Sequence, residues 1–393
     1  MACASAHAEN SNVTLYGLLS TGVAYTNNQG GNSSVKAVNG PMQTPRWGLR
    51  GVEDLGDGLS TVFVMESGFS MTNGTASQNG RMFGRQVYVG LQSNDYGTIT
   101  LGRQYDLANA VLWPYESATQ FAAYGTHIGD SDNVFNTFRV NNTVIYKSPV
   151  YEGLQVSGMY SLGGQTQSQS NNAYALGLNY QRGGLSLGTM YEVVNTPNSP
   201  TNQDGAVVAD YGFSSPFVKS PGGAGVDRQR IFGAGGAYKF GALGVSLLYT
   251  HVRFDYLDRT RLGLNNAEVS TTYNLSPRLL LGLAYIYTWG AYTPSDTRPK
   301  WHQINIGADY FLSKRTDLYV TGIYQRAPAT RSSRRYIRCC PHRAGARSRR
   351  WWACGTGSEL AGFRSGGMLD SRQFPCRTGF GLVNHIDARE YNI

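Results

Sequence analysis

PRWGLRGVEDLGDGLSTVFVMESGF, from Pro45 to Phe69, and FGRQVYVGLQSNDYGTITLGRQYD, from Phe83 to Asp106, hold four short runs in which apolar and polar residues alternate. Such alternation predicts β-strands with two different faces. Arginines recur in or beside these runs, at Arg46, Arg50, Arg85 and Arg103. If one face of such a strand is apolar enough to contact lipid, an arginine on the opposite face must contact water. A β-barrel with an aqueous lumen provides that water.

Composition supports a membrane barrel. The chain has 393 residues, 41% of them hydrophobic, yet its mean hydropathy is −0.33. No run approaches the ~18 apolar residues that a membrane-spanning helix needs, which excludes a helical membrane protein. Gly (49) and Tyr (26) are abundant, and charged residues make up only 15%. This composition fits short strands and turns, and we expect Trp47, Tyr88 and Tyr285 in the aromatic girdles of a barrel or facing lipid, and not binding sugar.

Charge and cysteine both divide the chain near Ala327. The residues before it carry a net charge of +1, and the 67 residues from it onward carry +8, with 12 Arg and no Lys. Only the positive charge of that segment would favour a nucleic-acid partner, so no such partner is expected. Residues 4–338 contain no cysteine, as suits an exported protein. Cys339, Cys340, Cys354 and Cys376 match no zinc spacing, and no catalytic motif occurs, so we predict no enzyme activity, cofactor or metal site.

Short turns and longer polar segments alternate along the chain and separate fifteen strands by about Gln325, most of nine to eleven residues. That length lets a tilted strand cross a bilayer. We therefore predict an all-β, transmembrane antiparallel barrel on a 16-strand plan, with 15 strands readable. Bacterial barrels have an even strand number, but no sixteenth strand is evident in the tail. Open edges would then lie in lipid, so poor assembly is expected.

Three regions are expected. Ala6, His7 and Ala8 have the small-x-small form of a secretory cleavage site, so residues 1–8 are interpreted as the remnant of a signal peptide. Residues 9–326 form the barrel. Residues 327–393 form an Arg/Cys-rich tail outside the barrel pattern, which is expected to be disordered or translated in a shifted frame; a genuine extension is the alternative.

The chain resembles the general porins of Gram-negative outer membranes, in the neisserial and related β-proteobacterial branch. The resemblance covers about residues 9–326. It rests on VTLYG (13–17), RWGLRGVEDLGDGL (46–59), MESGF (65–69), FGRQVYVGL (83–91), YGTITLGRQYD (96–106) and FRVNNTVIYKSP (138–149). It implies a homotrimer in outer-membrane lipid, with the apolar strand faces near the chain ends at the interface. It also implies that residues 106–138 are the third extracellular loop, folded inward to narrow the lumen.

The candidate site follows from this resemblance. The family's wall arginines correspond to Arg46, Arg85 and Arg139, and Arg103 matches a less uniformly used position. Arg50 lies two residues from Arg46, hence on the same strand face. Glu66 is expected to face the lumen as the partner of an arginine. The constriction-loop acids expected to face this basic wall are Asp106, Glu116, Asp130 and Asp132.

Each of these residues has a plainer interpretation. Arg46 and Arg85 would then only keep the lumen wall soluble. Arg103 would pair locally with Asp106, and the remaining loop acids would be solvated charges.

The predicted function is a water-filled channel in the cell outer membrane for passive diffusion of small hydrophilic solutes and ions. Clustered guanidinium groups favour anions, and because the body charge is only +1 the expected preference is mild. One alternative is a sugar-specific channel with an aromatic path along the lumen. Another is a soluble β-rich binding or adhesion protein, which would require strand faces too polar for lipid.

Overall fold

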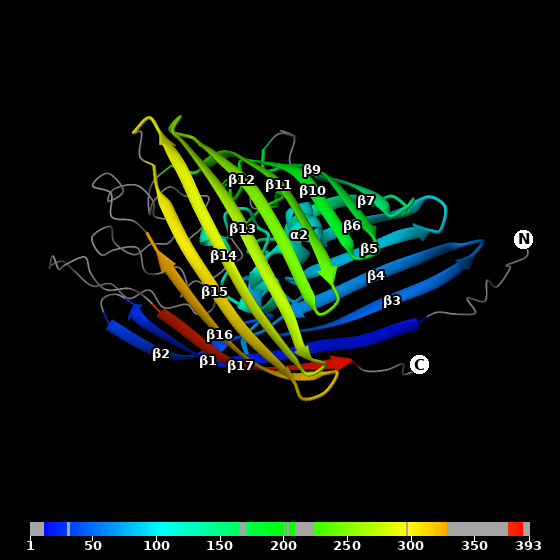
Figure 1. Cartoon of the computed structure of the whole chain (residues 1–393). Coiled ribbons are helices and arrows are strands. Elements are labelled where there is room, and N and C mark those ends of the chain that lie inside the picture. The colour runs from blue at the N-terminus through cyan, green and yellow to red at the C-terminus, as the bar shows by residue number, and fades with distance from the viewer. Residues whose placement is uncertain are drawn as a thin grey trace, which may run out of the picture.

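The computed structural model describes residues 12–327, apart from 30–31, 165–169, 200, 203, 209–223 and 296–297, and the backbone of 376–387. It is an antiparallel β-barrel (Figure 1). The predicted signal remnant and most of the tail lie outside these residues. The strands are β1 (Asn12–Gln29), β2 (Asn32–Asn39), β3 (Arg46–Gly56), β4 (Leu59–Gly68), β5 (Gln86–Ser93), β6 (Gly97–Gln104), β7 (Val140–Lys147), β8 (Leu154–Ser161), β9 (Ala173–Arg182), β10 (Leu185–Asn195), β11 (Val226–Phe240), β12 (Leu243–Tyr256), β13 (Arg261–Ser276), β14 (Leu279–Thr293), β15 (Lys300–Phe311), β16 (Thr316–Arg326) and β17 (Cys376–Asp387).

The sheet closes on itself. Each strand from β3 to β16 pairs antiparallel with the next, and β17 pairs with β1. On its other edge, β1 pairs with β3 through residues 12–18 and with β2 through residues 21–29. Because β2 and β3 share that edge end to end, they fill one strand position. The predicted 16-strand plan is confirmed.

Two expectations about individual segments were wrong. The Gly and Asn residues between Tyr25 and about Thr44 predict a loop after the first strand, but this segment contains β2. The tail supplies a closing strand, β17, between β16 and β1. Thr378 and Asn384 stand in register with Phe380 and Leu382, so the apolar series of this strand is too short to be recognised from the sequence. With β17 in place, the predicted open edges of β1 and β16 are paired. The origin of residues 327–393 stays a prediction.

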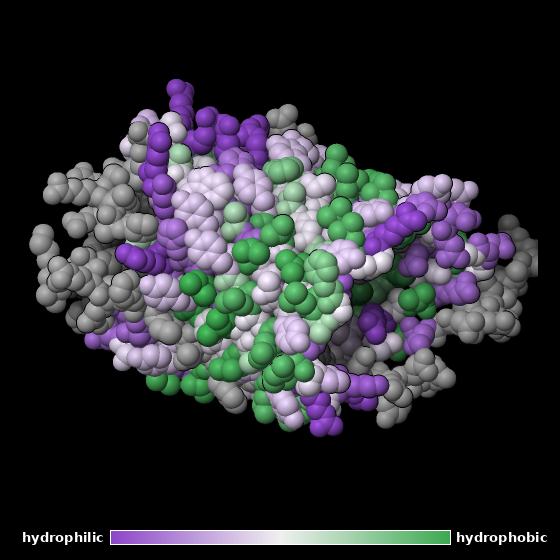
Figure 2. Space-filling view, in the orientation of Figure 1, coloured by the Kyte–Doolittle hydropathy of each residue, from purple (hydrophilic) through white to green (hydrophobic). Residues whose placement is uncertain are grey.

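The strands separate an apolar outside from a polar inside. Side chains that point outward include Leu247, Leu283 and Ile306, each more than half exposed. Figure 2 shows a band of such hydrophobic residues across the face formed by the later strands, with hydrophilic residues gathered towards the ends of those strands. Tyr88 differs from expectation. It alternates with the exposed Val87 and Val89 and therefore lies on the inner face, not in a girdle. No helix among the described residues is long and apolar enough to cross a membrane.

The segment 106–138, called the inward loop below, lies inside the barrel. It contains α2 (Leu107–Leu112), two 3₁₀ turns (Trp113–Tyr115 and Ile128–Asp130) and a π-helical turn (Ala118–Ala122). A four-residue helix, α1 (Ser77–Gly80), lies in the preceding loop. Leu107, Val111 and Tyr115 are buried in the main apolar cluster together with wall residues such as Met190 and Ile231. The predicted inward fold of the third loop is confirmed.

Glycines on the inner wall make room for this loop. A Cβ atom added to Gly235 would lie 2.4 Å from the Tyr115 ring, and one added to Gly282 would lie 2.1 Å from the Phe121 ring. The same close approach occurs on strands β9, β10, β11, β14 and β15, at Gly177, Gly188, Gly233, Gly235, Gly282 and Gly307. The loop can therefore lie directly against the backbone of these strands.

Candidate pore constriction

Three of the predicted wall arginines form one connected network with two tyrosines. The Arg85 guanidinium donates from Nε to Glu66 Oε1 at 2.7 Å and from Nη2 to the Tyr105 hydroxyl at 2.6 Å. The Arg139 guanidinium also joins the network, 5.5 Å from the Tyr105 ring centroid. The buried pair of Glu66 and Arg85 confirms the expected role of Glu66.

The network extends to β1 and β3. The Tyr16 hydroxyl donates to Glu66 Oε2 at 3.0 Å, and the Arg50 guanidinium lies 5.5 Å from the Tyr16 ring centroid. The two tyrosines thus hold guanidinium groups by cation–π contact and also reach the Glu66 carboxylate. Residues in or beside β1 and each strand from β3 to β7 contribute to this one arc of wall.

Arg46 and Arg103 are held by other contacts. Arg46 donates to the Thr44 carbonyl at 3.2 Å and to Gln43 Oε1 at 3.1 Å, so its head is turned to the segment before β3. Arg103 is buried and donates from Nε to the Gly84 carbonyl at 2.8 Å and from Nη1 to Asn141 Oδ1. Arg103 therefore links β6 to the segment before β5 and to β7.

The four predicted loop acids are all buried. Asp106 caps α2 by accepting from the Asn109 amide at 2.9 Å, and it also accepts from Asn133 Nδ2 at 2.7 Å. Asp130 accepts from the amides of Phe135 and Thr137 at 2.9 and 2.8 Å. These hydrogen bonds of the two carboxyl groups therefore lie within the inward loop itself.

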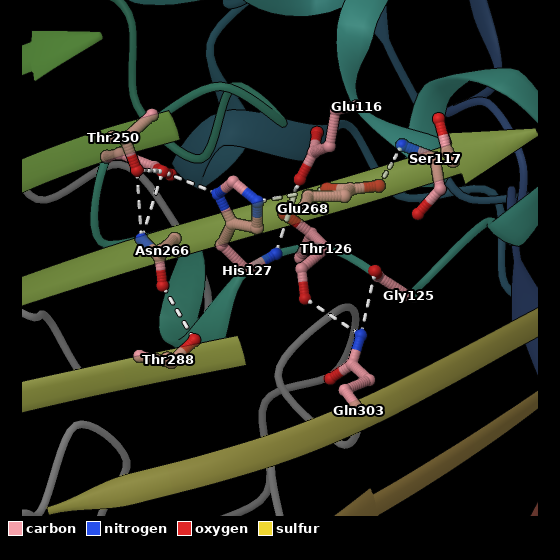
Figure 3. Close-up of polar contacts among 12 residues, drawn as sticks. Glu116, Ser117, Gly125, Thr126, His127, Thr250, Asn266, Glu268, Thr288 and Gln303 are labelled. Carbon is pink, nitrogen blue, oxygen red and sulfur yellow. Dashed lines mark hydrogen bonds and ion pairs between the residues drawn. The ribbon is translucent and has the colours of Figure 1, made fainter. Parts of the chain in front are cut away.

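The other two acids belong to a cluster around His127 that attaches the inward loop to the wall (Figure 3). His127 Nδ1 lies 2.6 Å from Asp132 Oδ2, and His127 Nε2 lies 3.0 Å from Oε2 of Glu268 on β13. Glu268 Oε1 accepts from the Ser117 amide at 2.6 Å. Glu116 Oε1 accepts from the Thr126 hydroxyl and from the His127 amide at 3.3 Å. Thr250 and Asn266, on β12 and β13, donate to Asp132.

The pKa values of the four loop acids shift in different directions, although burial by itself raises all of them. Burial raises the pKa of Asp106 to about 6, although Asn109 and Asn133 stabilise the charged form. Burial and then the charge of Asp132 raise the pKa of Asp130 to about 7. Burial raises the pKa of Glu116 well above its ordinary value. Burial opposes ionisation of Asp132 as well, but the charge of His127 overrides it and lowers the pKa of that carboxyl.

Sequence reasoning missed Tyr16, Tyr105, His127 and Glu268. Tyr105 directly precedes Asp106, and nothing in the sequence marks it, although its contacts join two arginines. Glu268 shares a strand face with the buried Asn266 and Ser270, and this period of two could have placed it on the inner wall. For His127, the scarcity of histidine in residues 9–326 was the one sign of a special role.

An antiparallel barrel with an apolar outer face, a polar inner face and a loop folded into its lumen has the architecture of an outer-membrane channel. The chain belongs to the Gram-negative porin family, whose profile matches residues 1–329. The match ends close to the change in composition near Ala327. The protein is therefore a channel-forming porin of the cell outer membrane, as predicted.

Individual relatives agree with this assignment. The chain is 30% identical over 372 residues to an outer membrane porin protein of Bordetella pertussis, covering 82% of this chain and 90% of the relative. Its fold is similar to that of the "Anion-selective porin from Comamonas acidovorans" (TM-score 0.71, 22% identity, 96% and 100% of the two chains). It is also similar in fold to the trimer form of OmpT from Vibrio cholerae (TM-score 0.64, 13% identity, 96% and 99%).

Proposed function

We propose that this porin prefers small anions and that the arginines of β3–β7 set the preference. The observation that carries the proposal is the network that joins Arg50, Arg85 and Arg139. The carboxylate of this network is Glu66, which accepts a hydrogen bond from Arg85. Arg46 adds a fourth positive charge beside it, at the start of β3. Clustered guanidinium groups in a confined aqueous passage attract anions and repel cations.

The loop acids oppose this preference less than their number suggests. The raised pKa values of Glu116 and Asp130 favour their neutral forms, and Asp132 lies against His127. The net field at the constriction is then dominated by the arginines. A similar fold in an anion-selective porin supports the same direction of preference.

The test is the ratio of anion to cation permeability, measured from the reversal potential in a KCl gradient across a planar bilayer. The variant Arg46→Ala/Arg85→Ala/Arg139→Ala is expected to lose most of its anion preference, because three positive charges leave the wall. Arg278→Ala, in an exposed turn, is the control and should keep the ratio. An unchanged ratio in the triple variant would show that these arginines do not set selectivity.

We further propose that the protein assembles as a homotrimer through the outer faces of β1, β3 and β5. These strands present exposed apolar side chains, including Leu15, Trp47 and Val89. Leu15→Arg should dissociate the trimer because a charge would enter the interface. Leu283→Arg on β14 has nearly the same exposure, 54% against 53%, and should leave trimers intact. Equal loss of trimer mass in the two variants, measured by light scattering in detergent, would reject this interface.

A further inference from the structure

The His127 cluster contains carboxyl and imidazole atoms beyond those that attach the inward loop to the wall. Each of three side chains has one polar atom held by a neighbour. Asp132 holds His127 Nδ1, the Ser117 amide holds Glu268 Oε1, and Thr126 holds Glu116 Oε1. His127 Nε2 and Glu268 Oε2 are left facing each other at 3.0 Å, and Glu116 keeps a second carboxyl oxygen, Oε2, that no neighbour holds among the described residues.

These side chains converge. One ligand atom from each of Glu116, His127 and Glu268 lies within 4.8 Å of the other two. All three residues are buried, and Figure 3 shows both carboxyl groups beside the imidazole. Glu116 Oε2 is buried and has no hydrogen-bond partner among the described residues. A buried carboxylate oxygen without a partner is costly unless something else binds it.

The charges in this cluster give an independent reason to expect a bound cation. Glu116, Asp132 and Glu268 bring three carboxyl groups together in one buried place, around a single imidazole. Even with Glu116 neutral, a protonated imidazole supplies one positive charge against the two carboxylates of Asp132 and Glu268. Buried charges are normally paired or bound to metal.

We propose that Glu116, His127 and Glu268 bind a divalent metal ion, with Zn²⁺ as the best match. One imidazole nitrogen and two carboxylate oxygens are a ligand set that zinc accepts. Asp132 orients the imidazole through Nδ1, the usual second contact of a metal-bound histidine. Binding displaces the proton from His127 Nε2, because a histidine ligand must be neutral. The ion links two ligands from the inward loop to one ligand on β13.

The experiment refolds the full chain in detergent after chelation, adds Zn²⁺, removes free ions and counts bound zinc by mass spectrometry. Roughly one ion per chain is expected in the unmodified protein. Glu116→Gln and Glu268→Gln should each lose it, whereas His251→Gln should keep it. His251 is a histidine on the neighbouring strand β12 and lies outside the cluster, so it controls for surface binding.

Zinc content well below one ion per chain in the unmodified protein would overturn the proposal and would leave a proton between His127 and Glu268. Equal zinc content in the unmodified protein and both glutamine variants would also overturn it. If those variants do not fold, crystals of the unmodified protein soaked in Zn²⁺ decide the question. An anomalous peak among the three side chains supports the site, and its absence there rejects it.

Discussion

Glu66 limits the positive charge that the constriction wall presents to solutes. It forms a buried ion pair with Arg85 at 2.7 Å and also accepts from the Tyr16 hydroxyl. The resemblance to porins indicated Arg85 from its motif, and a strand position indicated Glu66. The tyrosines that join them were not predictable, since their role depends on strands brought together by the closed sheet.

Replacing Glu66 should strengthen the proposed anion preference. Glu66→Gln keeps the size of the side chain but removes the charge that offsets Arg85, so the anion-to-cation permeability ratio should rise by roughly twofold. The reversal potential in a KCl gradient measures it. Glu53→Gln, at an exposed position of β3, is the matched control. A lower ratio in Glu66→Gln would mean that Arg85 needs Glu66 in order to face the lumen.

Asp106 should make the barrel less stable as pH rises. Its pKa is raised to about 6 from 3.8, so the folded chain holds a proton that the unfolded chain has released. Stability is then highest below pH 4 and falls until about pH 6, by about 3 kcal/mol for this group. The measurement is the temperature at which the folded band is lost on gels, followed as a function of pH. Asp106→Asn should make this temperature depend less on pH. Asp95→Asn, in an exposed turn, should leave this pH dependence unchanged.

At the scale of elements, the inward loop is positioned by the glycines of the wall. Sequence patterns predicted that residues 106–138 would enter the lumen, because the segment is long and resembles the third loop of porins. They did not predict which strands would receive it. The glycines in RIFGAGGAYKF and LLLGLAYIYT looked like a consequence of barrel composition, and only the paired strands show that they face Leu112, Tyr115 and Phe121.

Adding one methyl group to this wall should displace the loop. In Gly282→Ala, the new Cβ would lie 2.1 Å from Phe121 Cγ, so the ring must move. We expect a loss of about 1–3 kcal/mol, as for other overpacked interiors, and a changed single-channel conductance. Gly263→Ala, whose Cβ meets only His251 at 3.9 Å, should behave like the unmodified protein. In a Phe121→Ala background, Gly282→Ala should cost little stability, because the ring that the new methyl group would meet is gone. If the two losses of stability are additive, the contact is contradicted.

At the scale of the whole molecule, the strand count and the architecture were predictable, since the alternation and the turn spacing are local. The closing strand was not. Its apolar residues are separated by glycines, and its partners β1 and β16 lie far away in the sequence. The same is true of the His127 cluster, whose members are up to 152 residues apart along the chain (268 minus 116) and meet only in the closed barrel.

Closure by β17 can be tested by deletion. Removing residues 376–387 would leave β1 and β16 with unpaired backbone groups in lipid, each costing several kcal/mol. The deleted chain should lose the heat-modifiable folded band on gels. Removing residues 388–393 instead should retain the folded band, because those residues lie beyond the closing strand. Equal yields of folded protein from both deletions would show that closure does not depend on β17.

Most of the inward loop packs on β9–β16, although Ala123 and Tyr124 also reach β1 and β2. The arginine network belongs to β1 and β3–β7. The width of the passage and its charge are therefore controlled largely by different arcs of one ring. An engineer could retune ion preference at Arg50, Glu66 or Arg85 while leaving the inward loop unaltered, or displace that loop and change the aperture at Gly282 while leaving the charge unaltered. Selection acting on two nutrients that differ in size and in charge could likewise adjust each property in turn.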